Sequence, residues 1–451
     1  MKMFLKFALA GAVVLAAMQL VRPGIPSEPT IAEIQAPPQV RQILEKDCYS
    51  CHSNRRQLAW FDQIVPGYWL VRRDILIARK HLNFSTLGAK PAAAQRATLY
   101  EAVNMIQLGA MPLKQFTALH PDANVTPEEL AELKAYLAPW SAVGTTASAP
   151  NPVTTEAVLR TNLATVPAEF NGVPFEPGFE IWKPISFTDR GDNHTFRAIL
   201  GNEIAVRAAE SGNISPWPNG ARFAKIAWQQ AAREDGLVYA GKFVQVEFMV
   251  KDAKLYRKTD GWGWGRWRGL GLEPYGTDAG FVTECTACHE PVHGDDFVYT
   301  LPITAAKLTG DEVVNNRSAA LPRSLPYQSL GWRVVTMFVN PKAHTMATLF
   351  GNDAAMQAVT AQGSDFDRSP AYPAGSVLAL VTWNQREDPH WFGGRIPDSP
   401  LSVEFAESGA SGEAGVYRCY GGPLLKEQTF SPEDAAKRSG FLFNLAPARL
   451  P

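Results

Sequence analysis

The sequence predicts a multidomain protein in which an all-α domain precedes two α+β units, each built on an antiparallel sheet. Three observations support this fold class: a helical pattern in residues 39–140, a change of composition in residues 141–169, and an internal repeat that relates residues 170–304 to 326–450. The length of 451 residues agrees, because single cores stop growing at about 250–300 residues and longer chains divide into domains.

Residues 1–22 have the pattern of an export signal. Lys2 and Lys6 give a short basic region, and an almost unbroken apolar stretch follows in residues 7–21. No clean cleavage site of small residues comes before Pro23, so the segment is either a removed signal peptide or a retained signal anchor, although it is short for a bilayer span. Both alternatives predict a periplasmic protein, soluble or attached to the membrane by this segment alone.

A proline-rich spacer leads into the helical region, residues 39–140. Thr126 and Glu129 form a capping box with Pro127 at the first helical position. The helix that begins there repeats leucines on one face, at Leu130, Leu133 and Leu137. Residues 141–169 then turn rich in Ala, Thr, Ser, Asn and Pro, which is the composition of a linker.

Beyond the linker, period-two alternation predicts strands. In residues 220–228 it places Phe223, Lys225 and Ala227 on one face. In residues 243–250 it groups Val244, Val246, Phe248 and Val250 in the same way.

An internal repeat relates the two halves of this region. Residues 194–202 recur at 344–352, residues 220–230 at 375–385, and residues 246–248 at 403–405. The offset grows from 150 to 155 to 157 residues, so the insertions fall between elements, where loops tolerate them. Residues 170–304 and 326–450 are therefore expected to be two copies of one unit.

Four of the five cysteines fall into two Cys-x-x-Cys-His runs, Cys48-x-x-Cys51-His52 and Cys285-x-x-Cys288-His289. Two thiols at this spacing can add to the two vinyl groups of one porphyrin, and the adjacent imidazole can ligate the iron. A thioredoxin-like pair would need a βαβ context, and a zinc site would need further ligands nearby, whereas the next histidine after His52 is His81. The sequence thus predicts two covalently bound c-type haems, with His52 and His289 as axial ligands, and a c-type cytochrome domain at residues 39–140.

The sixth iron position is expected to differ between the two haems. Met111 lies in a Gly-x-Met-Pro turn after a helical stretch, which is how small electron-transfer cytochromes present a thioether; His81 is its rival, and a gap-filling role in the core is the other alternative for Met111. The second haem has no such turn. His194 sits at a repeated position, matched by His344, which indicates a structural role, and His293 follows the proximal ligand too closely. An open position that can bind a small molecule is therefore expected at the second haem.

The two copies differ where this chemistry would take place. The second copy lacks the Cys-x-x-Cys-His run and carries Leu380 where the first has Lys225. Cys419 falls near the position of Trp267 and is not a relic of the motif. A lysine on an apolar strand either points to solvent or is buried, and a buried lysine tends to lose its proton and become a nucleophilic amine.

The middle region resembles the cytochrome P-460 family. The matching features are the turn at residues 218–220 that leads to Lys225, the motif at residues 285–289, and the acidic and aromatic stretch at residues 295–299. In that family the lysine is cross-linked to the haem edge, the motif histidine is the proximal ligand, and the sixth position binds hydroxylamine or nitric oxide. The resemblance covers residues 170–304 and, more weakly, the haemless repeat.

The N-terminal part is similar to the haem-binding domain family that often precedes such modules. The matching text comprises residues 51–54, Trp60-Phe61, Pro66, Trp69 and residues 82–85. That family often has a histidine where this chain has Asp74, which argues against a first haem with two histidine ligands.

These resemblances imply an oxidoreductase that oxidises hydroxylamine or a related small nitrogen compound at the second haem, with Lys225 as a catalytic residue. Electrons would pass through the first haem to a redox partner such as a cytochrome c. Two alternatives stay open: a protein that binds nitric oxide or carbon monoxide without a cross-link, and a cytochrome that only transfers electrons. The net charge of −1 predicts no nucleic-acid partner.

Overall fold

A computed structural model describes residues 2–26, 29–55, 58–141, 162–278, 280–306, 314–362, 368–409 and 415–451. The chain forms two compact units, Met1–Trp140 and Ser141–Pro451. Most of the predicted linker, residues 142–161, lies outside the described residues.

Every regular element described in the first unit is a helix, which confirms the all-α prediction. The elements are α1 (Lys2–Met18), α2 (Pro38–Asp47), α3 (Tyr49–His52), η1 (Phe61–Gln63), α4 (Gly67–His81), α5 (Phe84–Leu87), α6 (Ala92–Gln107), α7 (Lys114–Thr117), η2 (Pro121–Ala123) and α8 (Pro127–Ser141). The capping box of α8 forms in both directions: Thr126 N donates to Glu129 Oε2 at 2.9 Å, and Glu129 N donates to Thr126 Oγ1 at 3.2 Å. Leu133 and Leu137 on its inner face are buried.

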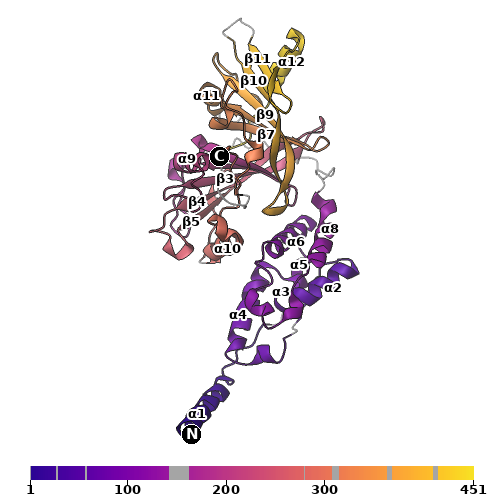
Figure 1. Ribbon diagram of the computed structural model, residues 1–451, viewed down its shortest axis with the longest axis vertical. Coiled ribbons are helices and arrows are strands. Elements are labelled where there is room, and N and C mark those ends of the chain that lie inside the picture. Colours follow the sequence, from indigo (N-terminus) through magenta and orange to yellow (C-terminus); the bar gives the residue numbers. More distant parts are fainter. Residues whose placement is uncertain are drawn as a thin grey trace. The chain divides into compact units, whose positions relative to one another are not determined.

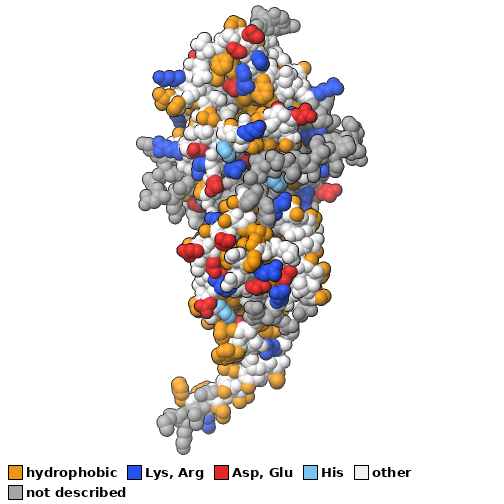
Figure 2. All heavy atoms as spheres, turned by 90° about the vertical axis from the view of Figure 1, so that its right-hand side faces the viewer, with side chains coloured by type: hydrophobic (Ala, Val, Ile, Leu, Met, Phe, Trp, Pro, Cys, Tyr) orange, Lys and Arg blue, Asp and Glu red, His pale blue; other side chains and the backbone are white. Residues whose placement is uncertain are grey.

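The N-terminal helix α1 exposes apolar side chains, and Figure 2 shows hydrophobic side chains along it. Phe4 is 82% exposed and Leu9 is 68% exposed. Within the described residues, no helix combines the length and the apolar character that crossing a bilayer requires.

The second unit is a closed antiparallel barrel flanked by helices (Figure 1). Its strands are β1 (Lys183–Arg190), β2 (Thr195–Gly201), β3 (Arg222–Ala232), β4 (Val238–Lys251), β5 (Trp262–Arg268), β6 (Glu273–Pro274), β7 (Arg333–Asn340), β8 (Thr345–Gly351), β9 (Val377–Asp388), β10 (Trp391–Glu407), β11 (Val416–Gly421) and β12 (Lys426–Gln428). The order β1-β2-β3-β4-β7-β8-β9-β10 closes because β10 also pairs with β1. Four strands of the barrel come from each copy of the repeat.

The helices of this unit also come in matching pairs. They are α9 (Glu203–Ser211), α10 (Gly280–His289), α11 (Asp353–Ala361) and α12 (Pro432–Phe443), with short η3 (Leu163–Thr165), η4 (Phe179–Ile181), η5 (Arg257–Thr259), η6 (Glu290–Asp295), η7 (Arg317–Ala319) and η8 (Ser329–Gly331). By position after the matched strands, α9 corresponds to α11, and α10 corresponds to α12. The second copy therefore retains the helix of the second motif but not its cysteines or histidine.

The repeated histidines have the structural role that their repetition predicts. His194 and His344 both adopt a positive φ of 53° in the turn before β2 and β8. The carbonyl of His194 accepts a hydrogen bond from Gln230 N, and that of His344 accepts one from Gln385 N, each at 2.9 Å. The same turn is thus built twice.

The interior of the barrel is one apolar core to which both copies contribute. Its fully buried aromatic residues include Phe187, Trp228, Phe350 and Trp383. The predicted face of β4 is confirmed for Val246, Phe248 and Val250, but Phe243 and not Val244 completes it. The register between β3 and β4 shifts at Trp228, which pairs with Phe243, and this shift turns Val244 away from the core.

The outer face of β2–β5 carries a second apolar cluster, which includes Ile199, Phe223 and Trp264 and which α9 covers. Cys285 of α10 and Phe297 pack against this cluster. On the other copy, an equivalent cluster brings α11 and α12 against β7–β9. Each copy thus has one sheet face against the shared core and one against its own helices.

Candidate haem centres

The first motif lies at the junction of α2 and α3. The His52 ring donates its Nδ1 hydrogen to the carbonyl of Leu82 at 3.1 Å, which leaves Nε2 as the atom that can bind iron. The loop that supplies this carbonyl is held in place because Asn83 donates to Asn54 Oδ1 at 2.9 Å and Asn54 N donates to Ser85 Oγ at 2.9 Å. The polar residues that follow the histidine therefore orient it.

The cysteines of this motif are half-buried, and their thiols are protonated at neutral pH. Burial raises the pKa of Cys48 to about 12 and that of Cys51 to about 11. Burial also lowers the pKa of His52, which keeps its imidazole neutral and able to ligate a metal. None of the chain's five cysteines, all of them in the described residues, forms a disulfide.

The two candidates for the sixth ligand of the first haem lie in different places. Met111 is half-buried on the turn after α6, where Gly109 has a φ of 72° and Met111 N donates to the Met105 carbonyl at 3.1 Å. His81 is exposed at the end of α4, directly before Leu82. His81 directly precedes Leu82, whose carbonyl accepts the Nδ1 hydrogen of His52.

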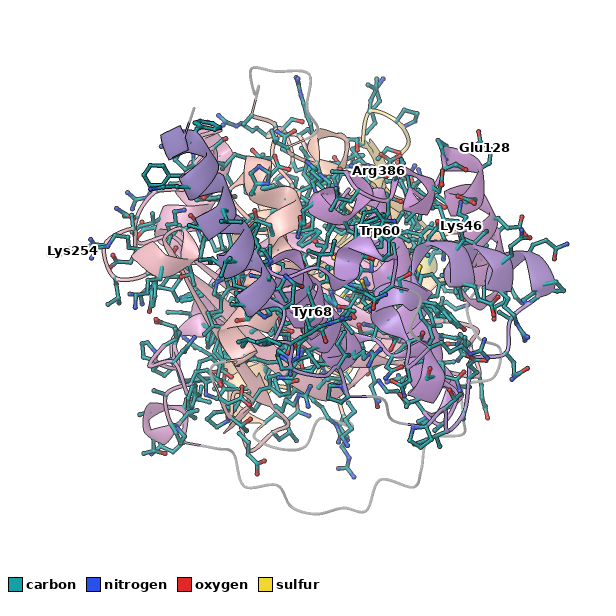
Figure 3. All side chains as sticks on the ribbon, turned by 90° about the horizontal axis from the view of Figure 1, so that it is seen from below. Lys46, Trp60, Tyr68, Glu128, Lys254 and Arg386 are labelled. Atoms are coloured by element: carbon teal, nitrogen blue, oxygen red, sulfur yellow. The ribbon has the colours of Figure 1, made fainter. Side chains whose placement is uncertain are left out.

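A buried carboxylate precedes the first motif. The side chain of Asp47 is 0% exposed, and Lys46 Nζ lies 3.3 Å from its Oδ1 (Lys46 is labelled in Figure 3). Burial raises the pKa of Asp47 from 3.8 to about 6. The folded protein therefore binds this proton more tightly than the unfolded chain, so stability falls as the pH rises from 3.8 to about 6 and stays lower above that.

The variant Asp47→Asn is accordingly expected to raise the free energy of unfolding at neutral pH by on the order of 2 kcal/mol. Well below pH 3.8 it should change little, because Asp47 is then neutral in both states. Thermal unfolding at the two pH values measures the difference, with the exposed Asp122→Asn as the control. An equal effect of Asp47→Asn at both pH values would contradict the assignment.

The second motif lies on α10, and the segment after it folds back over the helix. His289 donates its Nδ1 hydrogen to the Phe297 carbonyl at 2.7 Å, and the Tyr299 hydroxyl donates to the Cys288 carbonyl at 2.7 Å. The His289 ring lies between Trp264, with centroids 4.5 Å apart, and Tyr299, at 5.1 Å. Burial lowers the pKa of His289 to about 4, so a neutral imidazole with a fixed tautomer is available to iron.

The turn at residues 296–297 brings the Phe297 carbonyl to the His289 ring, and Asp296 holds this turn in place. Asp296 and Phe297 both have positive φ, 50° and 65°. The Asp296 carboxylate accepts from Lys251 Nζ at 2.6 Å and from the backbone N of Trp217 at 2.9 Å. The acidic and aromatic stretch at residues 295–299 thus supports the His289 ring.

Lys225 shares a face of β3 with Phe223, as the alternation predicts, and this is the outer face of the barrel, on which α10 packs. Its Nζ is 2.6 Å from Glu247 Oε2, and its side chain is 28% exposed, so it does not simply point to solvent. In the strand register Lys225 lies opposite Glu247 of β4, which lies opposite Arg266 of β5. Arg266 in turn pairs with Glu284 on α10 at 3.0 Å. A line of charges therefore joins β3 to the helix that carries the second motif.

The electrostatics link Lys225 to the motif itself. Burial lowers the pKa of Lys225, Glu247 raises it, and the nearby cations Arg197 and Arg266 lower it further. The charge of Lys225 in turn acts on Cys285 and His289. The structure thus brings together Lys225 and residues 285–289, which are some 60 residues apart in the chain.

Glu247 is a candidate site residue that no local sequence pattern indicates. Burial opposes its ionisation, but the charges of Lys225 and Arg266 lower its pKa to about 2. The alternation in residues 243–250 places Glu247 on the outer face, yet only the register between β3 and β4 puts it opposite Lys225.

The second copy has the same strand register but lacks the lysine and the Cys-x-x-Cys-His run. Leu380 lies opposite Glu404, as Lys225 lies opposite Glu247. Glu404 accepts two hydrogen bonds from Arg438 of α12, at 2.9 and 2.7 Å. Leu442 of α12 packs with Leu380 in one buried cluster. Cys419 lies opposite Glu404, the position of Arg266 and next to that of Trp267, as predicted.

The donor sets of both motifs fit a c-type haem. Each offers two thiols three positions apart in the chain and an imidazole whose Nδ1 is already hydrogen-bonded to a carbonyl. Around the second motif, Trp264 Nε1 and Arg197 Nε are buried and make no hydrogen bond within the described part of the chain. Among the described residues no cluster of three or more His, Cys, Asp or Glu side chains is arranged to hold a metal ion by itself.

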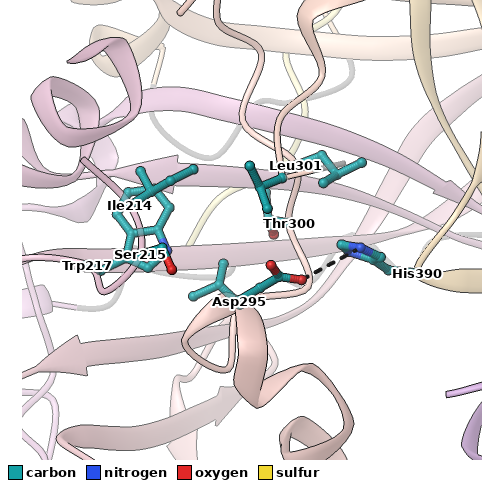
Figure 4. A pocket seen from close by; sticks show the side chains of 9 residues that line it. Ile214, Ser215, Trp217, Asp295, Thr300, Leu301 and His390 are labelled. Carbon is teal, nitrogen blue, oxygen red and sulfur yellow. Dashed lines mark ion pairs between the residues drawn. The ribbon is translucent and has the colours of Figure 1, made fainter. Parts of the chain in front are cut away.

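A small pocket lies beside residues 295–301, which follow the second motif in the chain. Apolar side chains such as Ile214, Trp217 and Val298 line it, together with the polar Asp295 and His390 (Figure 4). His390 comes from the second copy, so both copies border this pocket.

Two family models match the chain. Residues 12–139 match the haem-binding domain, and residues 176–300 match cytochrome P460. No curated protein matches the chain. The two matches confirm the resemblance, the order of the two modules and a haem cytochrome with a helical N-terminal domain.

Proposed function

We propose that this protein is a dihaem c-type cytochrome that oxidises hydroxylamine or a related small nitrogen compound at its second haem and passes the electrons through its first. The observation that carries this proposal is the placement of Lys225 beside residues 285–289, on the sheet face where α10 packs. In the P460 family, whose model this region matches, the corresponding lysine is cross-linked to the haem.

Each side chain of the second centre has a role in this proposal. Cys285 and Cys288 hold the haem, and His289 is its proximal ligand. When bound, the haem supplies an iron that can accept electrons from a small nitrogen compound. Lys225 would bond through Nζ to the haem edge; that bond would replace one N–H of the amine and one C–H of the haem edge, with dioxygen or a peroxide as the two-electron oxidant.

The cross-link also gives Glu247 a role. It replaces the Lys225 ammonium by an uncharged amine, so Glu247 loses the main charge that holds its pKa at about 2. The pKa then rises toward the range in which a carboxylate accepts a proton at neutral pH. Glu247 is thus the carboxylate that we propose takes up protons released by the substrate.

At the first centre, Cys48 and Cys51 hold the haem and His52 is one axial ligand. We propose Met111 as the other, because His81 lies beside the Leu82 carbonyl that holds the far side of the His52 ring. An iron with two strong protein ligands transfers electrons without binding substrate. A redox protein such as a cytochrome c is the proposed acceptor.

Turnover tests the proposal. The purified protein, mixed with hydroxylamine and an oxidised cytochrome c, is expected to reduce the cytochrome and to release a nitrogen oxide. An ordinary c-type spectrum with no reduction of the cytochrome would overturn it.

One observation favours a second candidate function, the binding of nitric oxide or carbon monoxide without catalysis. The 2.6 Å ion pair between Lys225 and Glu247 satisfies the lysine without any cross-link. Under that function the protein would bind the gas and leave hydroxylamine unchanged.

We further propose that the protein is exported and that α1 is retained and holds it at the membrane surface without crossing the bilayer. The residues after α1 are part of the helical unit: Gln19 exchanges two hydrogen bonds with the backbone of Val65, at 2.9 and 3.0 Å. Tyr68 Oη donates to the Pro23 carbonyl at 2.6 Å, and Trp69 Nε1 donates to the Val21 carbonyl at 2.8 Å. Cleavage within residues 19–23 would remove these contacts.

The mature protein is therefore expected in the membrane fraction with its N-terminus before Gln19. N-terminal sequencing and a high-salt wash of the membranes measure this. A soluble periplasmic protein that begins after Pro23 would contradict the anchor.

A further inference from the structure

We propose that the haemless copy positions the proximal histidine of the second haem through the hairpin between β9 and β10, with Trp391 and His390 as positioning residues. The inference rests on the proposed haem at His289. Because the barrel closes, the haemless copy can support His289 in the other copy.

Barrel closure brings this hairpin to the first copy. Asp189 and Arg190 of β1 pair with Arg395 and Gly394 of β10. The Asp189 carboxylate accepts from the side-chain amide of Gln385 at 2.8 Å, and so ties β1 to β9 as well.

Two polar residues of the first copy, Arg190 and Asp192, hold Trp391 in place. The Arg190 guanidinium lies 4.3 Å from the centre of its ring, and its Nε1 donates to Asp192 Oδ2 at 3.3 Å. Arg190 and Asp192 form a buried ion pair with each other. The ring so fixed makes an edge contact with Tyr299, with centroids 5.7 Å apart.

The His390 side chain binds the backbone of the same tyrosine. His390 Nδ1 donates to the Tyr299 carbonyl at 2.8 Å, and His390 N donates to Asp388 Oδ1 at 2.9 Å. On its other side, Nε2 lies 3.9 Å from Asp295 Oδ2 (Figure 4). His390 therefore contacts residues 295–299 at both ends.

Tyr299, held in this way, contacts His289 and the neighbouring Cys288. Its hydroxyl holds the Cys288 carbonyl and its ring packs edge-on against His289. Phe297, two residues earlier, accepts the Nδ1 hydrogen of His289. Supports of this kind set the orientation and basicity of a ligating imidazole, and through them the potential of the metal.

The internal repeat supplies a comparison within the molecule. The two copies meet at two seams of the barrel, where a strand of one copy pairs with a strand of the other. At the seam away from the haem motif, β4 pairs with β7 through apolar residues: Val238 with Val339, and Tyr239 with Phe338. There the hairpin between β3 and β4 places Leu237 against the apolar cluster that contains Leu442 of α12. The two seams share one architecture, but charged and hydrogen-bonding residues occur at the seam beside the haem motif.

Four variants of the full-length protein test the proposal, with Leu237→Ala at the other seam as the control. Trp391→Ala and His390→Ala are expected to keep both haems attached and to shift the midpoint potential and the ferric electron paramagnetic resonance signal of the second haem. Trp391→Phe keeps an aromatic ring, and His390→Asn keeps an N–H donor, so both should restore the wild-type values. Leu237→Ala should lower the melting temperature and leave both signals unchanged.

The proposal is overturned if Trp391→Ala and His390→Ala lower the melting temperature as Leu237→Ala does but leave the potential unchanged. It is also overturned if the conservative variants shift the potential as far as the alanines. Haem content separates this result from failure of the proposed function. A wild-type protein with haem only at Cys48 and Cys51 would overturn both proposals, whereas a protein with both haems and an unchanged potential would overturn this one alone.

Discussion

Replacing Lys225 by leucine is expected to leave both haems attached, to give the second haem an ordinary c-type absorption spectrum, and to lower hydroxylamine turnover by about 10–100-fold or more. Leucine suits this position, because Leu380 occupies it in the second copy, opposite Glu404 in the same register. Glu247 keeps Arg266 as a partner at 3.6 Å, so the carboxylate is not left alone in the site. The fold is therefore expected to tolerate the change.

Two further variants separate the cross-link from the charge. Lys225→Arg can keep the ion pair with Glu247 but does not provide a primary amine, so it should lose turnover as Lys225→Leu does. Lys242→Leu removes an exposed lysine from β4 and should have no effect. Turnover and the absorption spectrum are measured on all three. Wild-type turnover in Lys225→Leu would contradict the role proposed for the lysine.

Replacing both Cys285 and Cys288 by alanine is expected to halve the haem content of the chain and to abolish turnover. The first motif should keep its haem, because Cys48 and Cys51 belong to a separate compact unit with its own core. Haem staining after denaturing electrophoresis and the haem-to-protein ratio measure the change.

The fifth cysteine provides the matched control for this double variant. Cys419 is 5% exposed and lies in the haemless copy, so Cys419→Ala should keep the full haem content. A double variant that retains two haems, or that loses both, would contradict two independent attachment sites.

Much of the fold follows from short-range sequence patterns. The capping box at Thr126 predicts the start of α8, and the repeat predicts the paired turns at His194 and His344. Period-two alternation places Lys225 on a face with Phe223. Each of these features depends on residues that are close in the chain or on a direct copy of them.

The remaining features depend on pairings between distant strands. The closure of β10 on β1 makes one barrel out of two copies, and no local pattern specifies it. The register shift at Trp228 replaces Val244 by Phe243 in the core, and the register of β4 puts Glu247 opposite Lys225. The contact of His390 with Tyr299 joins residues 91 positions apart. Register and closure follow from the packing of the whole barrel, which period-two alternation does not determine.

We propose that the two Cys-x-x-Cys-His motifs hold haems of unequal function and that Lys225 makes the difference. A peptide map of the purified protein by mass spectrometry tests it most directly. We expect the peptide that contains Lys225 to be recovered joined through a haem to the peptide that contains Cys285 and Cys288, while the peptide with Cys48 and Cys51 carries a haem alone. Recovery of the Lys225 peptide free of haem would contradict the account.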